Sequence, residues 1–229
     1  MKYSKIRKAT FIKRPNRFIA HVLLDGKEEI VHVKNTGRCR EILKENTTVI
    51  LEKAKNKNRK TKYSLIAAYK NDLLINIDSQ VPNQVVFEAL KEGELAQFNK
   101  LEEVKREVTF GNSRFDIHFK NGNKEGFIEV KGVTLEDNGE LMFPDAPTAR
   151  GSKHVEEMIK AVKEGYLRYI FFLIQLQGAK SFTTNQKTDP KFSQVVKMAK
   201  ENGVNLLAYD CHITEDTITL NQQIPIILP

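Results

Sequence analysis

Two carboxylates and a lysine, Asp116, Glu129 and Lys131, lie on neighbouring segments that alternate apolar and polar residues. The segments 114–120 and 126–131 predict the two strands of a hairpin, because successive side chains of a strand point to opposite faces. The two acids and the lysine then share one face, and apolar residues of both strands share the other. That apolar face is predicted to consist of Phe115, Ile117, Phe119, Ile128 and Val130.

The register of this hairpin follows from its turn. With Gly122 and Asn123 at the centre, Asp116 is opposite Glu129, and directly opposed residues have Cβ atoms about 4.5–5.5 Å apart. Two carboxylates at that distance repel each other, and a divalent cation between them would reverse the effect. Hard oxygen ligands of this kind suit Mg²⁺ or Mn²⁺.

Lys131 completes the arrangement of an Asp…Glu-x-Lys metal nuclease. On the same face as the acids, it would orient or deprotonate a water molecule, or stabilise the negative charge of a phosphoryl transition state. The motif is short, however, and two readings stay open. In the second reading, Lys131 pairs with an acidic neighbour as part of an ordinary charged surface.

Other polar residues are secondary candidates for the same site. Glu107 precedes the hairpin and would supply a further metal ligand, or it is simply solvated. Gln175 lies in an apolar run, where a polar side chain needs a partner, and would contact the site or bond to backbone. Arg150, Lys153 and His154 lie where a loop enters a helix. They would hold a phosphate there, or serve as helix-capping and surface charge.

The elements around the hairpin predict an α/β domain with a mixed sheet. A further strand is expected at 107–110. Apolar spacing predicts a helix over 152–164 with Ser152 as its N-cap, and a second helix over 189–203 follows Asp189 as N-cap. The nearly unbroken apolar run at 168–176 is typical of a strand buried on both faces. One more strand is expected at 204–210.

The first 80 residues contain five or six segments with strand character, separated by turn signals. At this length a small barrel of the OB type is the natural expectation, with a small sandwich as the alternative. Residues 39–44 are expected to form one or two helical turns. The composition changes near residue 81, so we predict an OB-like basic domain at 1–80 and a nuclease-like domain at 81–229.

The net charge of +8 is unevenly distributed along the chain: residues 1–80 carry an excess of 11 basic residues, and the remainder an acidic excess of 3. Such a one-sided excess indicates a polyanionic partner, with DNA first, RNA as a second nucleic acid, and an anionic membrane surface a weaker option. A merely soluble basic surface is the alternative. The residues predicted to contact DNA are Arg14, Arg17, Arg38, Lys55, Lys57, Arg59, Lys60 and Lys62.

Several classes of protein are disfavoured by the sequence. No apolar run approaches the length of a membrane span, and the basic start lacks the apolar stretch of a secretory signal. Cys39 and Cys211 are far apart and belong to no CxxC pair, which predicts free thiols in a reducing cytoplasm. No nucleophile-elbow, P-loop or dinucleotide motif is present.

Several stretches together resemble a known family. They are "NRFIAHV", "VHVKNTGRC", "NRKTKYSL", "VPNQVV", "REVTFGNSRFD", "IEVKGVTL", "FPDAPTARGSKHVEEM" and "GVNLLAYDC". They cover nearly the whole chain and are similar to the sugar fermentation stimulation protein (SfsA) family. One departure is Cys39, where this resemblance would place a methionine.

The resemblance implies an N-terminal OB-like domain and a C-terminal domain of the PD-(D/E)xK nuclease fold. It also implies DNA binding with little sequence preference and a link to regulation of sugar (maltose) metabolism. It places the nuclease-like acidic pair on Asp116 and Glu129 and the lysine on Lys131, and a turn on Asn35–Thr36–Gly37. It leaves open whether such a chain cuts nucleic acid.

Three hypotheses therefore remain. The chain is a metal-dependent phosphodiesterase, a DNA-binding regulatory protein that retains a nuclease fold without turnover, or a binding module for another anionic partner such as RNA or a phosphorylated ligand. Cleavage that needs metal and Asp116 would favour the first. Binding without product would favour the second, and competition among these ligands would identify the third.

Overall fold

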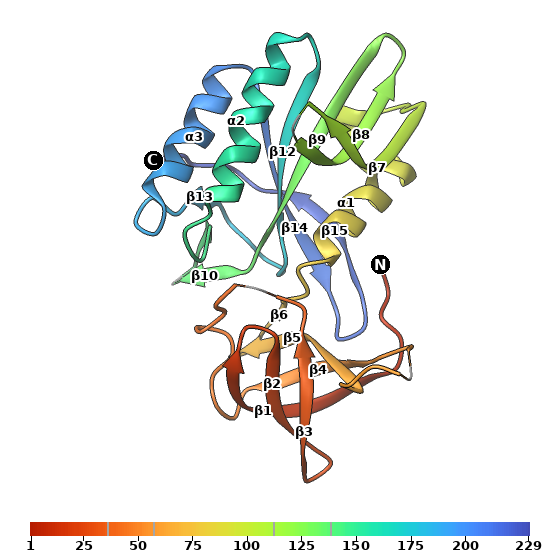
Figure 1. Ribbon diagram of the computed structural model, residues 1–229, viewed down its shortest axis with the longest axis vertical. Coiled ribbons are helices and arrows are strands. Elements are labelled where there is room, and N and C mark those ends of the chain that lie inside the picture. The colour runs from red at the N-terminus through yellow and green to blue at the C-terminus, as the bar shows by residue number, and fades with distance from the viewer. Residues whose placement is uncertain (36, 57, 112, 138) are drawn as a thin grey trace.

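The computed structural model describes residues 1–35, 37–56, 58–111, 113–137 and 139–229. Thr36, from the turn implied by the family resemblance, and Lys57, a predicted DNA-contacting residue, lie outside the described residues. The N-terminal region forms a barrel, and the rest of the chain forms an α/β layer structure above it in Figure 1. Within the described ranges, no helix is long and apolar enough to cross a membrane.

The N-terminal barrel is built from short antiparallel strands. They are β1 (Ile6–Asn16), β2 (Ile19–Leu24), β3 (Lys27–Val33), β4 (Thr48–Lys53), β5 (Tyr63–Lys70) and β6 (Leu73–Asn76). Their order is β3-β2-β1-β4-β5-β6, and a parallel pairing of β3 with β5 closes the barrel. Val22, Val31, Leu51 and Leu65 are fully buried. The prediction of an OB-like barrel is confirmed.

The loop from β3 to β4 contains the segment expected to be helical. It forms a single hydrogen-bonded turn, in which the Leu43 N–H donates to the Cys39 carbonyl at 2.9 Å. Cys39, Ile42 and Leu43 are buried in the barrel core. The turn therefore covers one end of the barrel with apolar side chains.

The helix α1 (Val81–Glu92) follows β6 and carries the chain into the second region. Pro82 lies in its first turn, where the missing N–H removes no helical hydrogen bond. Gly93 ends the helix with φ 72°, a left-handed conformation that glycine adopts without strain. The buried face of α1, which includes Val85, Val86 and Ala89, packs in one core cluster with the sheet described next.

The second region is a mixed sheet with helices on both faces. Its sheet has the order β15-β14-β12-β9-β8-β7, in which β9, β12 and β14 are parallel neighbours. The elements are η1 (Ala96–Phe98), β7 (Glu103–Phe110), β8 (Ser113–Asn121), β9 (Lys124–Val133), α2 (Ala149–Lys163), β12 (Leu167–Ile174), α3 (Pro190–Glu201), β14 (Asn205–Ile213) and β15 (Ile218–Gln223). A smaller sheet joins β10 (Leu135–Asp137), β11 (Glu140–Phe143) and β13 (Phe182–Thr184).

The central strand β12 shows why its sequence is almost entirely apolar. Ile170 and Phe172 belong to the core cluster that contains residues of α2 and α3, whereas Phe171 and Leu173 belong to the cluster of α1. Helices therefore cover both faces of this strand (Figure 1), as the apolar run predicts.

One helix start differs from the prediction. α2 begins at Ala149, and Thr148 is its N-cap, accepting a hydrogen bond from the Gly151 N–H at 3.1 Å. Ser152, the predicted N-cap, lies buried inside the helix. The apolar period starts near Ser152, but the capping hydroxyl lies one turn earlier, and the cap determines where a helix begins. For α3 the predicted N-cap Asp189 is confirmed, with the Phe192 N–H 2.9 Å from its Oδ1.

The barrel and the second region are joined by polar contacts, of which those of Gln175 are buried. The Gln175 side-chain amide donates to Asn76 Oδ1 at 2.9 Å and to the Asp78 carbonyl at 3.1 Å. The Arg38 N–H of the barrel donates to Asp145 Oδ2 of the second region at 2.9 Å. The junction is thus specified by directional bonds as well as by apolar burial.

Candidate functional site

The β8–β9 hairpin has the predicted register. Ile117 pairs with Ile128 and His118 pairs with Phe127, which is the pairing that a turn at Gly122 requires. The paired ladder begins at Ile117. Asp116 and Glu129 therefore come one step beyond its last pair, where the two strands begin to diverge.

The predicted division of the hairpin into one apolar and one polar face is partly wrong. Ile117 and Phe119 belong to the α1 core cluster, but Phe115 belongs to the opposite cluster and lies 5.2 Å from the Phe127 ring, centre to centre. The alternation of side chains along β8 breaks near Asp116. The residue opposite Asp116 on β7 is Glu107, and its φ of 57° is not a strand conformation. The polar face is also not an open surface, because α2 contributes His154 to it.

Asp116 is held between a helix and the neighbouring strand. Its Oδ1 accepts from the Asn83 side-chain amide of α1 at 2.7 Å, and its Oδ2 accepts from the Val130 N–H at 2.8 Å. Burial, with the nearby charge of Glu129, raises the pKa of Asp116 above its usual range, although Lys131 opposes the shift. Each carboxylate oxygen keeps a second lone pair that could face a ligand.

Glu129 is only 2% exposed, and its two oxygens differ. Oε1 lies 2.6 Å from Lys131 Nζ and 2.6 Å from His154 Nδ1. Oε2 is buried and has no hydrogen-bond partner among the described residues. Burial alone would raise the pKa of Glu129, but Lys131 and His154 outweigh it and hold the pKa below its usual value. Glu129 is thus an ionised carboxylate with one buried oxygen unused.

A hollow of about 290 Å³ surrounds these side chains. It brings together five predicted site residues, Asp116, Glu129, Lys131, Arg150 and His154. Its other lining residues are Ser79, Asn83, Arg114, Val130, Thr148 and Gly151. The buried Glu129 and the partly buried Asp116 thus lie at one place with the first turn of α2 and two exposed arginines.

Three other predicted residues lie elsewhere. Glu107 is exposed and bonds to Arg114 at the outer edge of the sheet. Lys153 is exposed on α2 and is not among the residues that line the hollow. Gln175 is buried at the junction with the barrel and lines an adjacent hollow. Both hollows share Ser79 as a lining residue.

The residues predicted to contact DNA separate into two groups. Arg14, Arg17 and Arg38 line one hollow of the barrel. The second group, Lys55, Arg59, Lys60 and Lys62, lies in the loop between β4 and β5. The Lys53 N–H donates to the Lys5 carbonyl just before β1. From there to Arg14, β1 is about 30 Å long as extended strand, so the loop and Arg14 lie at opposite ends of β1.

The site residues partly fit a divalent cation. Among the residues that the structure describes, no group of three or more His, Cys, Asp or Glu side chains could hold a metal ion. Asp116 and Glu129 nevertheless offer hard oxygen ligands, and the unpartnered Glu129 Oε2 is the kind of buried atom that a cation would satisfy. The pair could hold an ion whose remaining ligands are water, as Mg²⁺ prefers.

Sequence reasoning missed several residues of these hollows. Asn83 lies in the stretch "VPNQVV", and nothing in its spacing to Asp116 indicates that the two meet. Arg114 is two residues from Asp116, a spacing that could have indicated it. Arg40 lines the barrel hollow, and its position two residues after Arg38 is a comparable signal.

Comparison with known proteins agrees with this two-part architecture. The family model described as the SfsA N-terminal OB domain matches residues 12–77, and the model described as the sugar fermentation stimulation protein RE domain matches residues 80–217. The chain belongs to the SfsA family. The resemblance read from the sequence is therefore confirmed.

Relatives in the SfsA family match the chain from end to end. A sugar fermentation stimulation protein homolog of Alkaliphilus oremlandii is 55% identical over 231 residues, covering 99% of this chain and 98% of the relative. A homolog of Clostridium perfringens is 54% identical over 230 residues, covering 100% of both.

A solved SfsA structure has the same fold. It is SfsA of Pyrococcus furiosus, described as a complex with Ca²⁺, and it matches with a TM-score of 0.91 at 26% identity. The match covers 99% of this chain and 98% of the other. The OB domain followed by a restriction-endonuclease-like domain is thus the architecture of the SfsA chain.

Proposed function

We propose that this SfsA-family chain binds nucleic acid with little sequence preference and hydrolyses its phosphodiester bonds with a divalent cation, Mg²⁺ or Mn²⁺. The observation that carries the proposal is the unpartnered oxygen of Glu129. It lies buried in the hollow that also contains Asp116 and Lys131. A buried acceptor without a partner is unfavourable unless a ligand completes it.

The side chains of the hollow have distinct proposed roles. Asp116 and Glu129 would hold the cation, Asp116 oriented by Asn83 and the Val130 N–H. When bound, the cation would activate a water molecule and offset the charge of the phosphate. Lys131 donates one N–H to Glu129 Oε1, which leaves it further donors for that water or for a phosphate oxygen. The exposed arginines Arg114 and Arg150 would bind flanking phosphates.

The charge of the barrel supports nucleic acid as the partner, with DNA first and RNA second. A basic N-terminal half beside a nearly neutral second half favours contact with a phosphate backbone, which gives salt-sensitive and sequence-tolerant binding. Both cysteines are free and buried, which suits the reducing cytoplasm that we propose as its location. A link from DNA binding to the regulation of sugar metabolism is the part of the proposal that the family name suggests.

A second candidate function is DNA binding without turnover. It is favoured by the small number of ligands, since no group of three metal-binding side chains occurs in the described ranges. It is also favoured by Lys131, whose Nζ pairs with Glu129. In this reading the carboxylate pair is an inherited feature of the fold.

The test is an incubation of the purified full chain with labelled single-stranded, duplex and branched DNA and with RNA, in Mg²⁺, Mn²⁺ or EDTA. Asp116→Asn, Glu129→Gln and Lys131→Met are compared with the same exchanges at exposed positions, Asp72→Asn, Glu201→Gln and Lys197→Met. We expect metal-dependent product, reduced at least about 100-fold in each site variant and unchanged in each control.

Two results would reject the nuclease proposal. Cleavage that persists in EDTA, or that survives all three site substitutions, would place the activity elsewhere or in a contaminant. Salt-sensitive binding with no product in either metal would establish the second candidate function.

A further inference from the structure

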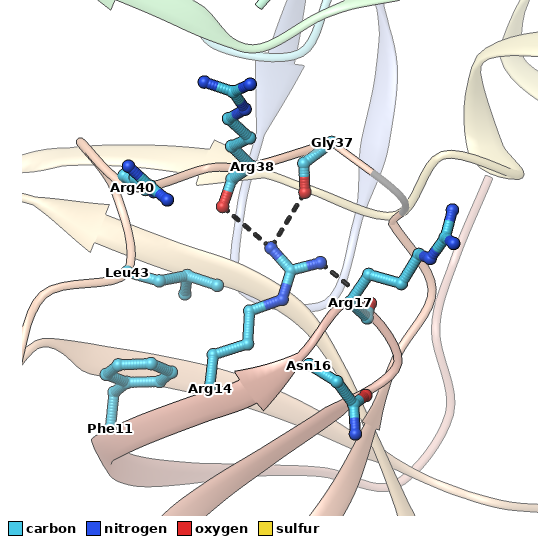
Figure 2. A pocket seen from close by; sticks show the side chains of 8 residues that line it. All are labelled: Phe11, Arg14, Asn16, Arg17, Gly37, Arg38, Arg40 and Leu43. Carbon is cyan, nitrogen blue, oxygen red and sulfur yellow. Dashed lines mark hydrogen bonds between the residues drawn. The ribbon is translucent and has the colours of Figure 1, made fainter. Parts of the chain in front are cut away.

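A hollow of about 350 Å³ opens on the barrel beside the junction of the two regions. Four arginines line it, Arg14, Arg17, Arg38 and Arg40, and Phe11 and Leu43 supply apolar surface (Figure 2). Asn16 and Gly37 complete the lining. The hollow therefore combines dense positive charge with a small apolar floor.

Arg14 organises this hollow instead of facing outward. Its Nη1 donates to the carbonyls of Gly37 and Arg38, each at 2.9 Å. Its Nη2 donates to the carbonyls of Arg17 at 2.8 Å and Asn35 at 2.6 Å. These bonds fix the end of β1 to the loop after β3, and the guanidinium groups of Arg17 and Arg38 point away from Arg14 (Figure 2). Arg14 is thus a positioning residue.

The other arginines remain available to an anion. Across the described part of the chain, no carboxylate forms an ion pair with Arg17, Arg38 or Arg40. The Arg17 guanidinium lies 5.3 Å from the ring centre of Phe18, which is 48% exposed. An exposed ring next to unpaired guanidinium groups is the combination that binds an unpaired base and its phosphate.

One further hollow shares a lining residue with this hollow and another with the carboxylate site. Gly37 also lines a second hollow of about 180 Å³ at the junction, together with Asn35, Asp145 and Ser79. Ser79 in turn lines the hollow of Asp116 and Glu129. A series of three neighbouring hollows, each sharing a lining residue with the next, therefore runs from the arginines of the barrel to the acids of the second region.

We propose that these three hollows form the track of a single strand of nucleic acid. The strand is held at the barrel by Arg17, Arg38 and Arg40, with a base against the exposed Phe18 ring, and runs past Gly37 and Ser79 to Asp116 and Glu129. A duplex keeps its base faces stacked inside and cannot offer them to the Phe18 ring, whereas a single strand can. The proposal identifies single-stranded nucleic acid as the substrate class of the proposed nuclease. It rests on the proposed function only for the cleavage step.

The binding test is carried out in EDTA, so that no cleavage can occur. Fluorescence anisotropy compares a single-stranded DNA, the matching RNA and the corresponding DNA duplex on the full chain. We expect either single strand to bind at least about tenfold more tightly than the duplex. The DNA and RNA arms distinguish which strand is preferred.

Two triple variants of equal charge locate the track. Arg17→Gln/Arg38→Gln/Arg40→Gln should weaken single-strand binding at least about tenfold. The plot of log binding constant against log salt concentration should become less steep, by about 0.7 for each phosphate that the protein no longer neutralises. The control, Lys55→Gln/Lys60→Gln/Lys62→Gln, removes the same charge from the β4–β5 loop and should have the smaller effect. Thermal melting establishes that both variants fold. If the arginine variant fails to fold, photocrosslinking of a bromodeoxyuridine strand to the wild-type chain replaces it, and a crosslink at Phe18 is expected.

Each result decides the proposal. Duplex binding equal to single-strand binding, a larger effect of the lysine triple, or crosslinks confined to the β4–β5 loop would overturn it. Arginine-dependent single-strand binding without any product in Mg²⁺ or Mn²⁺ would reject the nuclease function and leave the track. Cleavage that prefers duplex DNA and is unchanged in the arginine triple variant would reject the track and leave the nuclease function.

Discussion

Lys131 Nζ lies 2.6 Å from Glu129 Oε1, so the lysine of the motif is an ion-pair partner of the acid two residues before it on β9. The pair makes the two acids of the site unequal. Lys131 and His154 hold the pKa of Glu129 below its usual value, while burial and the charge of Glu129 raise the pKa of Asp116. We therefore expect that removing the charge of Asp116 stabilises the protein, whereas removing the charge of Lys131 destabilises it.

Asp116→Asn should stabilise the metal-free protein. The variant removes a partly buried charge next to Glu129, and the Asn83 amide can turn over so that both hydrogen bonds of the side chain persist. We expect the free energy of unfolding in EDTA at pH 7 to rise by about 1 kcal/mol, measured by urea denaturation. The same variant should lose any rise in melting temperature that Mg²⁺ or Mn²⁺ gives the wild type.

The stability gain of Asp116→Asn should depend on pH. Because the folded pKa of Asp116 is raised above its usual 3.8, its protonated form is favoured by folding, and ionisation destabilises the fold. The difference in free energy of unfolding between variant and wild type should be complete above the raised pKa. It should shrink as the pH falls through that pKa and disappear near pH 3.8. Urea curves of both proteins in EDTA across this range provide the measurement. A gain that does not change with pH would contradict the assignment.

Lys131→Met should destabilise the protein. It leaves the buried Glu129 carboxylate with His154 as its remaining side-chain hydrogen-bond partner, and removing one member of a buried ion pair typically costs about 3 kcal/mol. The free energy of unfolding at pH 7 measures the effect. Lys197→Met, at an exposed position of α3, is the matched control and should change stability by less than about 0.5 kcal/mol. Equal effects of the two substitutions would show that the pair adds nothing.

Gln175→Met should weaken the junction between the barrel and the second region. Methionine has a similar volume but leaves Asn76 Oδ1 and the Asp78 carbonyl without the donors they have at 2.9 and 3.1 Å. Because Asn76 Oδ1 keeps the Asp78 N–H and the Asp78 carbonyl keeps the Val81 N–H as donors, we expect a loss of about 1–2 kcal/mol in the free energy of unfolding. Gln186→Met, at an exposed position, provides the comparison, and a loss no greater than that of the control would argue against a junction role.

Both thiols should resist modification in the folded protein. Burial raises the pKa of Cys39 to about 12 and also raises the pKa of Cys211. Because the thiolate is the reactive form, reaction of native protein with a disulfide reagent at pH 8 should be about a thousandfold slower than that of free thiol. Both cysteines should react at once in guanidinium chloride. Rapid reaction without denaturant would mean that the barrel opens readily at Cys39.

The sequence by itself determined the local features of this protein. Alternation and the Gly122 turn predicted the register of Ile117 with Ile128, and a capping aspartate followed by proline predicted the start of α3 at Pro190. The apolar run at 168–176 predicted a strand covered on both faces. These features depend on residues close together in the chain, which is why spacing alone reveals them.

Only the tertiary structure decided how these features combine. Asn83 reaches Asp116 from 33 residues away, His154 reaches Glu129 from 25 residues away, and Arg14 gives its donors to carbonyls of the loop after β3. The same packing turned Phe115 to the opposite core from Ile117. Contacts between distant residues of this kind depend on how whole helices and strands pack together. The spacing of residues within one segment does not predict which distant helix will cover it.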